Sequence, residues 1–237
     1  MAKHIMAIGA HILDAEISCG MTLAKHSMLG DKVTTVALTA GENGHPKEFT
    51  KEEFRRINIK GAEDFAVELG GQFICLNYSD SQVPETEELY NTLADLIRKE
   101  KPDIILTHWG GSGHEDHNLA PKAVSKAVRR AGYSESENYP PHRVSKVYYA
   151  ENWEDMRGFI PYLYVDVTAA FDLWSRAIQK VYFAKNATYF RYYEYYEALS
   201  RVRGELARIQ IPGCERAECF AISEHDRFNT VLRQDSL

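Results

Sequence analysis

The sequence has few cysteines, no long apolar run and no basic block, and each absence excludes a class of protein. Its 237 residues include four cysteines, which are too few and too scattered for the disulfide framework of a secreted domain: Cys19, Cys75, Cys214 and Cys219. No apolar run approaches the roughly 18 residues that a transmembrane helix needs. Met1 leads directly into a strand-like segment, so we expect no signal peptide. These features predict a reduced, cytoplasmic setting and no membrane partner.

Charge and composition narrow the choice further. The 28 basic residues are outnumbered by 34 acidic ones, which gives a net charge of −6 and argues against a nucleic-acid partner. A hydrophobic content of 44% with 11% aromatic residues excludes a disordered chain and supports a substantial core. We expect a single domain over residues 1–237, with an α/β core over 1–131 and a C-terminal elaboration over 132–237.

The first half of the chain alternates short β-branched segments with amphipathic ones. This alternation occurs four times and predicts an α/β, Rossmann-like fold with a mostly parallel sheet and helices on both faces. The expected strands here are His4–Gly9, Val33–Leu38, Phe73–Leu76 and Asp103–Thr107, and the expected helices are Glu16–Leu29, Lys51–Leu69, Glu85–Glu100 and Leu119–Ala131. In such sheets, ligands bind outside the carboxyl ends of the strands, so we expect the active site there.

Two polar clusters follow strands at that edge. His11 and Asp14 come after the first strand, and His114 and His117 come after the fourth. Residues three apart at a turn entering a helix can direct two side chains at one centre. Two imidazoles and a carboxylate suit a zinc ion that keeps its fourth position open for water, and a further histidine nearby would be free for acid–base chemistry.

Several motifs in the chain are similar to those of one family. Residues 10–15 read A-H-I-L-D-A where the PIG-L / LmbE-like zinc deacetylases have A-H-P-D-D-E, and residues 113–117 read G-H-E-D-H, matching the family's G-H-x-D-H. Residues 39–42 (T-A-G-E), 164–168 (Y-V-D-V-T) and 217–220 (A-E-C-F) resemble three further family motifs. The chain therefore resembles this family over essentially its whole length.

The resemblance assigns roles to particular residues. It implies that His11, Asp14 and His117 bind one zinc ion per chain, and that His114 stabilises or protonates the reacting centre. Asp116 would orient a histidine. The family's substrate-contacting arginine falls at Asn58, next to Arg55 and Arg56. As substrate-binding residues we expect Arg56, Glu42 of the T-A-G-E motif, and Trp109, which follows the fourth strand.

The first motif departs from the family pattern at the residue that matters most for hydrolysis. The family's general base is an aspartate, and Leu13 stands in its place, with Ala15 where the family has a glutamate. Leucine cannot remove a proton from water, so a hydrolase would need another base, with Glu16, Glu42, Asp116 and His114 as the candidates.

Three functions are open at this point. The first is a zinc-dependent hydrolase of a non-peptide C–N bond, which removes an acyl group from an N-acylated amino sugar or a similar small polar metabolite. The second is a metal-dependent hydratase of an unsaturated oxo-acid, similar to the 4-oxalomesaconate hydratases, which lack the base aspartate. Its anionic substrate would need cations near the metal, for which Arg55, Arg56 and Lys60 are candidates. The third is a non-catalytic metal- or sugar-binding relative.

A tyrosine-rich segment follows in the C-terminal part. We expect a helix over Asn186–Glu205 in which Tyr189, Tyr192, Tyr193 and Tyr196 share one face. That face would pack on the core or on a second subunit. It predicts a homo-oligomer.

Overall fold

The computed structural model describes residues 2–133, 136 and 138–223. Its strands are β1 (His4–His11), β2 (Lys32–Thr39), β3 (Gln72–Tyr78), β4 (Ile104–His108), β5 (Lys146–Ala150), β6 (Leu163–Asp166) and β7 (Ala217–Ala221). Its helices are α1 (Asp14–Ser18), α2 (Gly20–Met28), α3 (Lys51–Glu68), α4 (Glu87–Glu100), α5 (Glu115–Ala131), α6 (Phe171–Ile178), α7 (Tyr182–Asn186) and α8 (Tyr192–Ala207), with 3-10 turns η1 (Glu42–Gly44) and η2 (Thr168–Ala170). None of these helices has both the length and the apolar character needed to cross a bilayer.

The strands form one seven-stranded sheet in the order β3-β2-β1-β4-β5-β7-β6. The pairs from β3 to β5 are parallel, and β7 runs antiparallel to both β5 and β6. This arrangement confirms the predicted α/β fold with a mostly parallel sheet. The C-terminal part of the chain extends the same sheet with β6 and β7.

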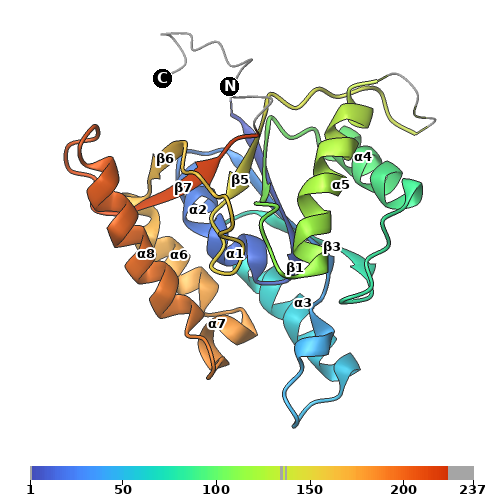
Figure 1. Ribbon diagram of the computed structural model, residues 1–237, viewed down its shortest axis with the longest axis horizontal. Helices are drawn as coiled ribbons and strands as arrows, with labels where there is room; N and C mark the ends of the chain where they lie inside the picture. The colour runs from blue at the N-terminus through green and yellow to red at the C-terminus, as the bar shows by residue number, and fades with distance from the viewer. Residues whose placement is uncertain (1, 134–135, 137, 224–237) are drawn as a thin grey trace.

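Helices cover both faces of the sheet (Figure 1). Successive residues of β1 point to opposite faces, as the pleat requires: Ile5 and Ala7 belong to one core, and Met6 and Ile8 to the other. The first core packs against α2, α6 and α8, and the second against α4 and α5. Burial on both faces explains why the central strands read as nearly continuous apolar runs.

The predicted helix over Glu16–Leu29 is two helices, because Cys19 breaks it with φ −128° and ψ −6°. The break lies where the Trp174 ring enters: a Cβ on Gly20 would be 2.6 Å from that ring. The indole Nε1–H donates to the carbonyl oxygen of Glu16 at 2.9 Å. A side chain inserted into the helical hydrogen-bond ladder is a common cause of such a break.

The tyrosine-rich helix starts later than predicted, at Tyr192, so Tyr189 precedes it and is exposed. Tyr192 and Tyr196 are buried in the first core. Tyr193 stacks on Trp174 with the ring centroids 5.7 Å apart. Three of the four tyrosines therefore pack within the chain, and Tyr189 is exposed.

Candidate metal centre

The first polar cluster is formed by a tight turn at the carboxyl end of β1. His11 ends the strand, Asp14 begins α1, and Leu13 between them has φ 102°. The turn leaves no room at Gly9, where a Cβ would lie 2.9 Å from that of Asp14. It brings the His11 backbone N–H to within 2.6 Å of Asp14 Oδ2, so both side chains face the same point.

Helix α5 brings His117 to this point from the carboxyl end of β4. His11 Nδ1 lies 3.1 Å from His117 Nε2 and 3.3 Å from Asp14 Oδ2, and His117 Nε2 lies 3.5 Å from the same oxygen. For metal–ligand bonds of about 2.0–2.1 Å, tetrahedral ligand atoms are about 3.3–3.4 Å apart. The three atoms thus have the mutual spacing of three corners of a tetrahedral zinc site.

The second nitrogen of His11 faces two carboxylates. His11 Nε2 lies 3.2 Å from Asp80 Oδ1 and 3.3 Å from Asp116 Oδ2. Both aspartates are buried, and each also accepts a backbone N–H: Asp80 from Asn43 at 2.8 Å and Asp116 from Ser81 at 2.9 Å. Sequence reasoning missed Asp80, although it directly follows β3 at the edge where ligands were expected.

The second nitrogen of His117 also faces two carboxylates. His117 Nδ1 lies 3.2 Å from Asp155 Oδ1 and 3.2 Å from Glu154 Oε1. The other oxygen of Asp155 lies 3.1 Å from His108 Nδ1, and His108 Nε2 lies 3.2 Å from Asp14 Oδ2. Glu154 and Asp155 were not among the predicted site residues. No metal-binding spacing in the sequence marks Glu154 and Asp155, which follow β5.

His114 borders the cluster on a further side. Its ring stacks on His117 with centroids 4.7 Å apart and meets the edge of His11 at 4.9 Å. As the N-cap of α5, its Nδ1 accepts the Asp116 backbone N–H at 3.2 Å. Burial and the neighbouring His117 and His11 lower the pKa of His114, which favours its neutral form. A neutral ring whose Nδ1 accepts a hydrogen bond carries its proton on Nε2 and can donate it.

The charges in the cluster reinforce one another. Burial opposes ionisation of Asp14, but His117 and His108 outweigh it and hold its pKa well below the usual range. Burial likewise opposes ionisation of Asp155, and hydrogen bonds with His108 and His117 lower the pKa of that carboxyl. Both carboxylates are therefore ionised at neutral pH. Burial opposes protonation of His11, but its contacts with Asp116, Asp14 and Asp80 outweigh burial and raise the pKa of His11, so a divalent cation bound there would displace that proton.

Two predicted carboxylates lie at the edge of this cluster with other partners. Glu16 is buried, and its Oε2 accepts the Leu13 backbone N–H at 2.8 Å at the start of α1. Burial raises the pKa of Glu16 to about 7. Glu42 Oε1 accepts the Asp80 backbone N–H at 3.2 Å, and its Oε2 lies 3.6 Å from the Arg55 guanidinium. Glu42 therefore supports the loop that carries Asp80.

The remaining predicted residues have different surroundings. Trp109 lies at the carboxyl end of β4, and its Nε1–H donates to the Arg157 carbonyl at 3.0 Å. Arg56 is exposed, and its Nε donates to the Glu52 carbonyl at 3.4 Å. Asn58 is buried and donates to the Ala40 carbonyl at 2.8 Å. The structure thus brings His11, Asp14, His114, Asp116 and His117 together, but not Arg56.

These features define a class: an α/β protein with a candidate divalent-metal centre at the carboxyl edge of its parallel strands. The family model described as PIG-L, GlcNAc-PI de-N-acetylase, matches residues 6–128. The chain belongs to this family, which confirms the resemblance seen in the motifs. The match ends before β5, so Asp155 lies beyond it.

Two relatives have names that describe sugar deacetylases. A 1D-myo-inositol 2-acetamido-2-deoxy-alpha-D-glucopyranoside deacetylase 2 of Catenulispora acidiphila is 26% identical over 184 residues, which cover 62% of this chain and 60% of the relative. A diacetylchitobiose deacetylase of Thermococcus kodakarensis is 28% identical over 190 residues, covering 75% and 68%. The chain thus spans about 60% of the length of the first of them.

A solved structure with a closely similar fold is GalB, the 4-carboxy-2-hydroxymuconate hydratase of Pseudomonas putida KT2440. Its TM-score is 0.83 at 21% identity, covering 94% of this chain and 98% of that one. At this identity the likeness concerns the fold, which both a deacetylase and a hydratase can use.

Proposed function

We propose that the protein is a zinc-dependent hydrolase that removes the acyl group from an N-acylated amino sugar or a similar small polar metabolite. The observation that carries this proposal is the mutual spacing of 3.1–3.5 Å among His11 Nδ1, Asp14 Oδ2 and His117 Nε2. Family membership and the named sugar deacetylases among the relatives support the same reaction.

The donor chemistry fits one zinc ion. Two imidazoles and one carboxylate form a common catalytic zinc set, and their far nitrogens face carboxylates, as metal-bound histidines usually require. Zinc in this position would polarise the acyl carbonyl and lower the pKa of a water molecule. His11, Asp14 and His117 would hold the ion, while Asp116 and Asp155 keep the two imidazole rings oriented.

His114 is suited to stabilise the charge that develops on the acyl oxygen. Its proton is on Nε2, and one nitrogen of its ring lies within 4.8 Å of one nitrogen each of His11 and His117. A fixed N–H donor beside the reacting carbonyl is worth about 10²–10³ in rate.

The step that removes a proton from water is the weak part of this site. Leu13 offers no base, and the candidate carboxylates bond to other groups: Glu16 to the Leu13 N–H, Glu42 to the Asp80 N–H, and Asp116 to His11 and the Ser81 N–H. We infer that the protein is a slow hydrolase in which the lowered pKa of the water replaces most of the base's contribution.

The charge around the site favours a neutral or cationic substrate. The far sides of His11 and His117 face Asp80, Asp116, Glu154 and Asp155. Of the three cations suggested for an anionic substrate, Arg55 pairs with Glu42 and Lys60 with Asp64, and the exposed Arg56 donates to the Glu52 carbonyl. These carboxylates offset the charge of a bound zinc ion and so weaken its attraction for a di- or tricarboxylate, whereas an N-acylated sugar does not depend on that attraction.

The hydratase is the second candidate, because Leu13 removes the base that amide hydrolysis uses. Addition of water across a carbon–carbon double bond of an oxo-acid would use the same three residues, His11, Asp14 and His117, to hold the metal. The fold shared with GalB is compatible with this reaction but does not distinguish it from deacetylation.

One pair of variants distinguishes the two candidates. Zinc-loaded wild-type protein is assayed for acetate release from N-acetylglucosamine derivatives and for an absorbance change with unsaturated oxo-acids. We expect acetate release, and we expect Leu13→Asp to raise it by about 10²-fold, the lower range of a general base's contribution. Leu13→Asn is the matched control, because asparagine has the same shape, tolerates positive φ and cannot act as the base. Conversion of oxo-acids without acetate release by either protein would replace the hydrolase with the hydratase.

Two further properties stay proposals. Self-association is supported by Val202 and Leu206 of α8 and by Ile209 just after it, which are exposed apolar side chains that a second copy would cover. A light-scattering mass near 27 kDa would contradict it. A reduced, cytoplasmic setting accords with the free state of Cys19, Cys75, Cys214 and Cys219.

A further inference from the structure

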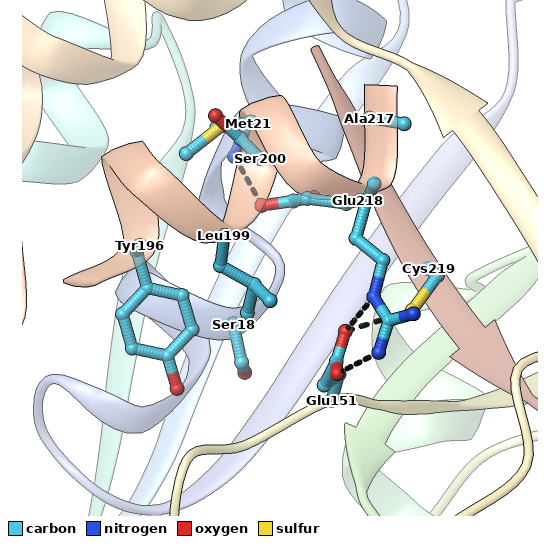
Figure 2. A pocket seen from close by; sticks show the side chains of 10 residues that line it. Ser18, Met21, Glu151, Tyr196, Leu199, Ser200, Ala217, Glu218 and Cys219 are labelled. Carbon is cyan, nitrogen blue, oxygen red and sulfur yellow. Dashed lines mark hydrogen bonds and ion pairs between the residues drawn. The ribbon is translucent and has the colours of Figure 1, made fainter. Parts of the chain in front are cut away.

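Helix α8 holds the segment that follows β5 at two points. Arg203 donates from two guanidinium nitrogens to the Glu151 carboxylate, one bond being the 2.8 Å contact from Nε to Oε2. Cys219 Sγ lies 2.8 Å from the same Oε2 (Figure 2). The second point is about two helical turns earlier, where the Tyr196 hydroxyl donates to Asn152 Oδ1 at 3.0 Å and accepts the Trp153 backbone N–H at 3.2 Å.

The second contact continues into the candidate metal centre. Asn152 Nδ2 donates to Asp155 Oδ2 at 3.0 Å. Asp155 then contacts His117 through one oxygen and His108 through the other, at 3.2 and 3.1 Å. Tyr196, Asn152 and Asp155 are each at most 4% exposed. The hydroxyl of Tyr196 is thus connected to His117 through two side chains, with every link at hydrogen-bond distance.

The space beside these contacts is too small for a ligand of its own. The cavity between α8, β7 and the start of α2, lined by Glu151, Tyr196 and Glu218 among others, has a volume of about 10 Å³, enough for about one water molecule (Figure 2). The buried polar groups beside this cavity therefore bond to other groups of the protein and not to a ligand.

We propose that Tyr196 and Asn152 are positioning residues that hold Asp155 against His117 and His108, so that helix α8 sets the affinity of the metal centre. This inference rests on the proposed function only in taking His117 as a zinc ligand. The three residues lie outside the 6–128 stretch that matches the family model. A carboxylate fixed on the far nitrogen of a metal-binding histidine holds the ring in place and increases its basicity. Loosening that carboxylate should weaken metal binding without removing a ligand.

The test measures zinc affinity directly, by competition with a chelator of known affinity, in full-length Tyr196→Phe and Tyr193→Phe proteins. Both variants lose one tyrosine hydroxyl from the same helix and keep the ring. The hydroxyl of Tyr193 bonds to Ser175 at 2.7 Å, which makes this variant the matched control. We expect Tyr196→Phe to raise the zinc dissociation constant about 3- to 10-fold, less than the roughly 10–100-fold typical of a group that touches a ligand. Tyr193→Phe should leave it unchanged, and thermal unfolding of the two variants checks that they are equally folded.

A second variant covers the case in which Tyr196→Phe does not fold. Asn152→Leu keeps the volume and removes the link to Asp155, and it should weaken zinc binding at least as much. Equal affinity in Tyr196→Phe and wild type, or equal weakening in Tyr193→Phe, would overturn the inference. Acetate release is measured separately: absence of turnover with selective weakening in Tyr196→Phe would defeat the proposed activity and support the positioning role. Turnover with unchanged zinc affinity in Tyr196→Phe would do the reverse.

Discussion

His11 and His117 each face two carboxylates with one ring nitrogen, but the two pairs of carboxylates come from different halves of the chain. His11 Nε2 faces Asp80 and Asp116, both from the parallel half, while His117 Nδ1 faces Glu154 and Asp155, both from the segment after β5. The first pair is held by backbone N–H groups of the Asn43 and Ser81 loops. Asp155 is held by the side chain of Asn152, which in turn accepts a hydrogen bond from Tyr196 of α8. One side of the centre thus depends on loops at the strand ends, and the other depends on the packing of a distant helix.

The largest effect should be a loss of stability on removal of the Arg203–Glu151 ion pair, which links α8 to the segment after β5. Arg203→Leu leaves the Glu151 carboxylate buried beside Cys219 without its cation. Removing one partner of a buried ion pair costs about 3–5 kcal/mol, and chemical denaturation should show a loss of this size. Arg208→Leu is the control, because Arg208 pairs with Glu205 on the exposed surface, where a pair contributes about 0–1 kcal/mol. Equal losses in both variants would mean that α8 does not anchor the segment after β5 through this pair.

Replacing His114 tests the side of the centre where the substrate would react. Neither of the two carboxylate pairs, which face His11 and His117, is paired with His114. His114→Gln should lower kcat by about 10²–10³-fold, because the donor to the acyl oxygen is lost. The zinc dissociation constant should stay within about twofold, since His114 is not one of the three proposed ligands. Steady-state kinetics together with chelator competition measures both quantities. Loss of zinc in this variant would instead make His114 a ligand.

The comparison itself is tested by one matched pair of variants. Asp116→Asn and Asp155→Asn each neutralise one carboxylate behind a different histidine, and each should weaken zinc binding by about 10–100-fold. Asp116→Asn leaves the buried Asp80 on His11, whereas Asp155→Asn leaves the exposed Glu154 on His117, so we expect the smaller effect for Asp116→Asn. Asp155 serves both His117 and His108, so its replacement should have the larger effect. The reverse order in chelator competition would show that the loop-held side dominates.

The same division explains how much the sequence could predict. The alternation of strands and helices, the edge that carries the site, and the meeting of the two clusters, His11 with Asp14 and His114 with His117, follow from local periodicity and from the rule for parallel sheets. The choice of His117 over His114 as a ligand came from the resemblance to the family. Asp80 obeys the same rule and could have been found. Asp155 and Tyr196 could not, because their contacts depend on how β5, the following segment and α8 pack together over long sequence separations. The break at Cys19 has the same origin, since it depends on Trp174.

The smallest and most gradual effect we expect is on the pH dependence of stability. It concerns a histidine at the amino end of β1, at the other end of that strand from the candidate centre. His4 is buried, with Nδ1 2.8 Å from the Glu100 carbonyl and Nε2 2.8 Å from Thr34 Oγ1. Burial and the nearby Lys32 lower its pKa below 6.5. The unfolded chain therefore binds the proton more readily, and the free energy of unfolding should fall as the pH drops through about 6.5 towards the lower folded value.

The change should be at most about 1.4 kcal/mol per pH unit. His4→Gln should lose this part of the pH dependence, which urea denaturation between pH 5 and 8 would measure as a difference between the two proteins. Parallel curves would mean that His4 does not titrate differently in the folded protein, and that acid sensitivity belongs to the candidate centre instead.

The most direct test of the account is the metal content of two proteins purified alike. After exposure to zinc and removal of excess metal, the wild type should retain one zinc ion per chain by elemental analysis, and Asp14→Ala should retain little, with an affinity at least about 100-fold lower because a ligand and not its support has been removed. Wild-type protein that retains no zinc, or an Asp14→Ala variant that retains as much as the wild type, would contradict the claim that His11, Asp14 and His117 bind one ion together.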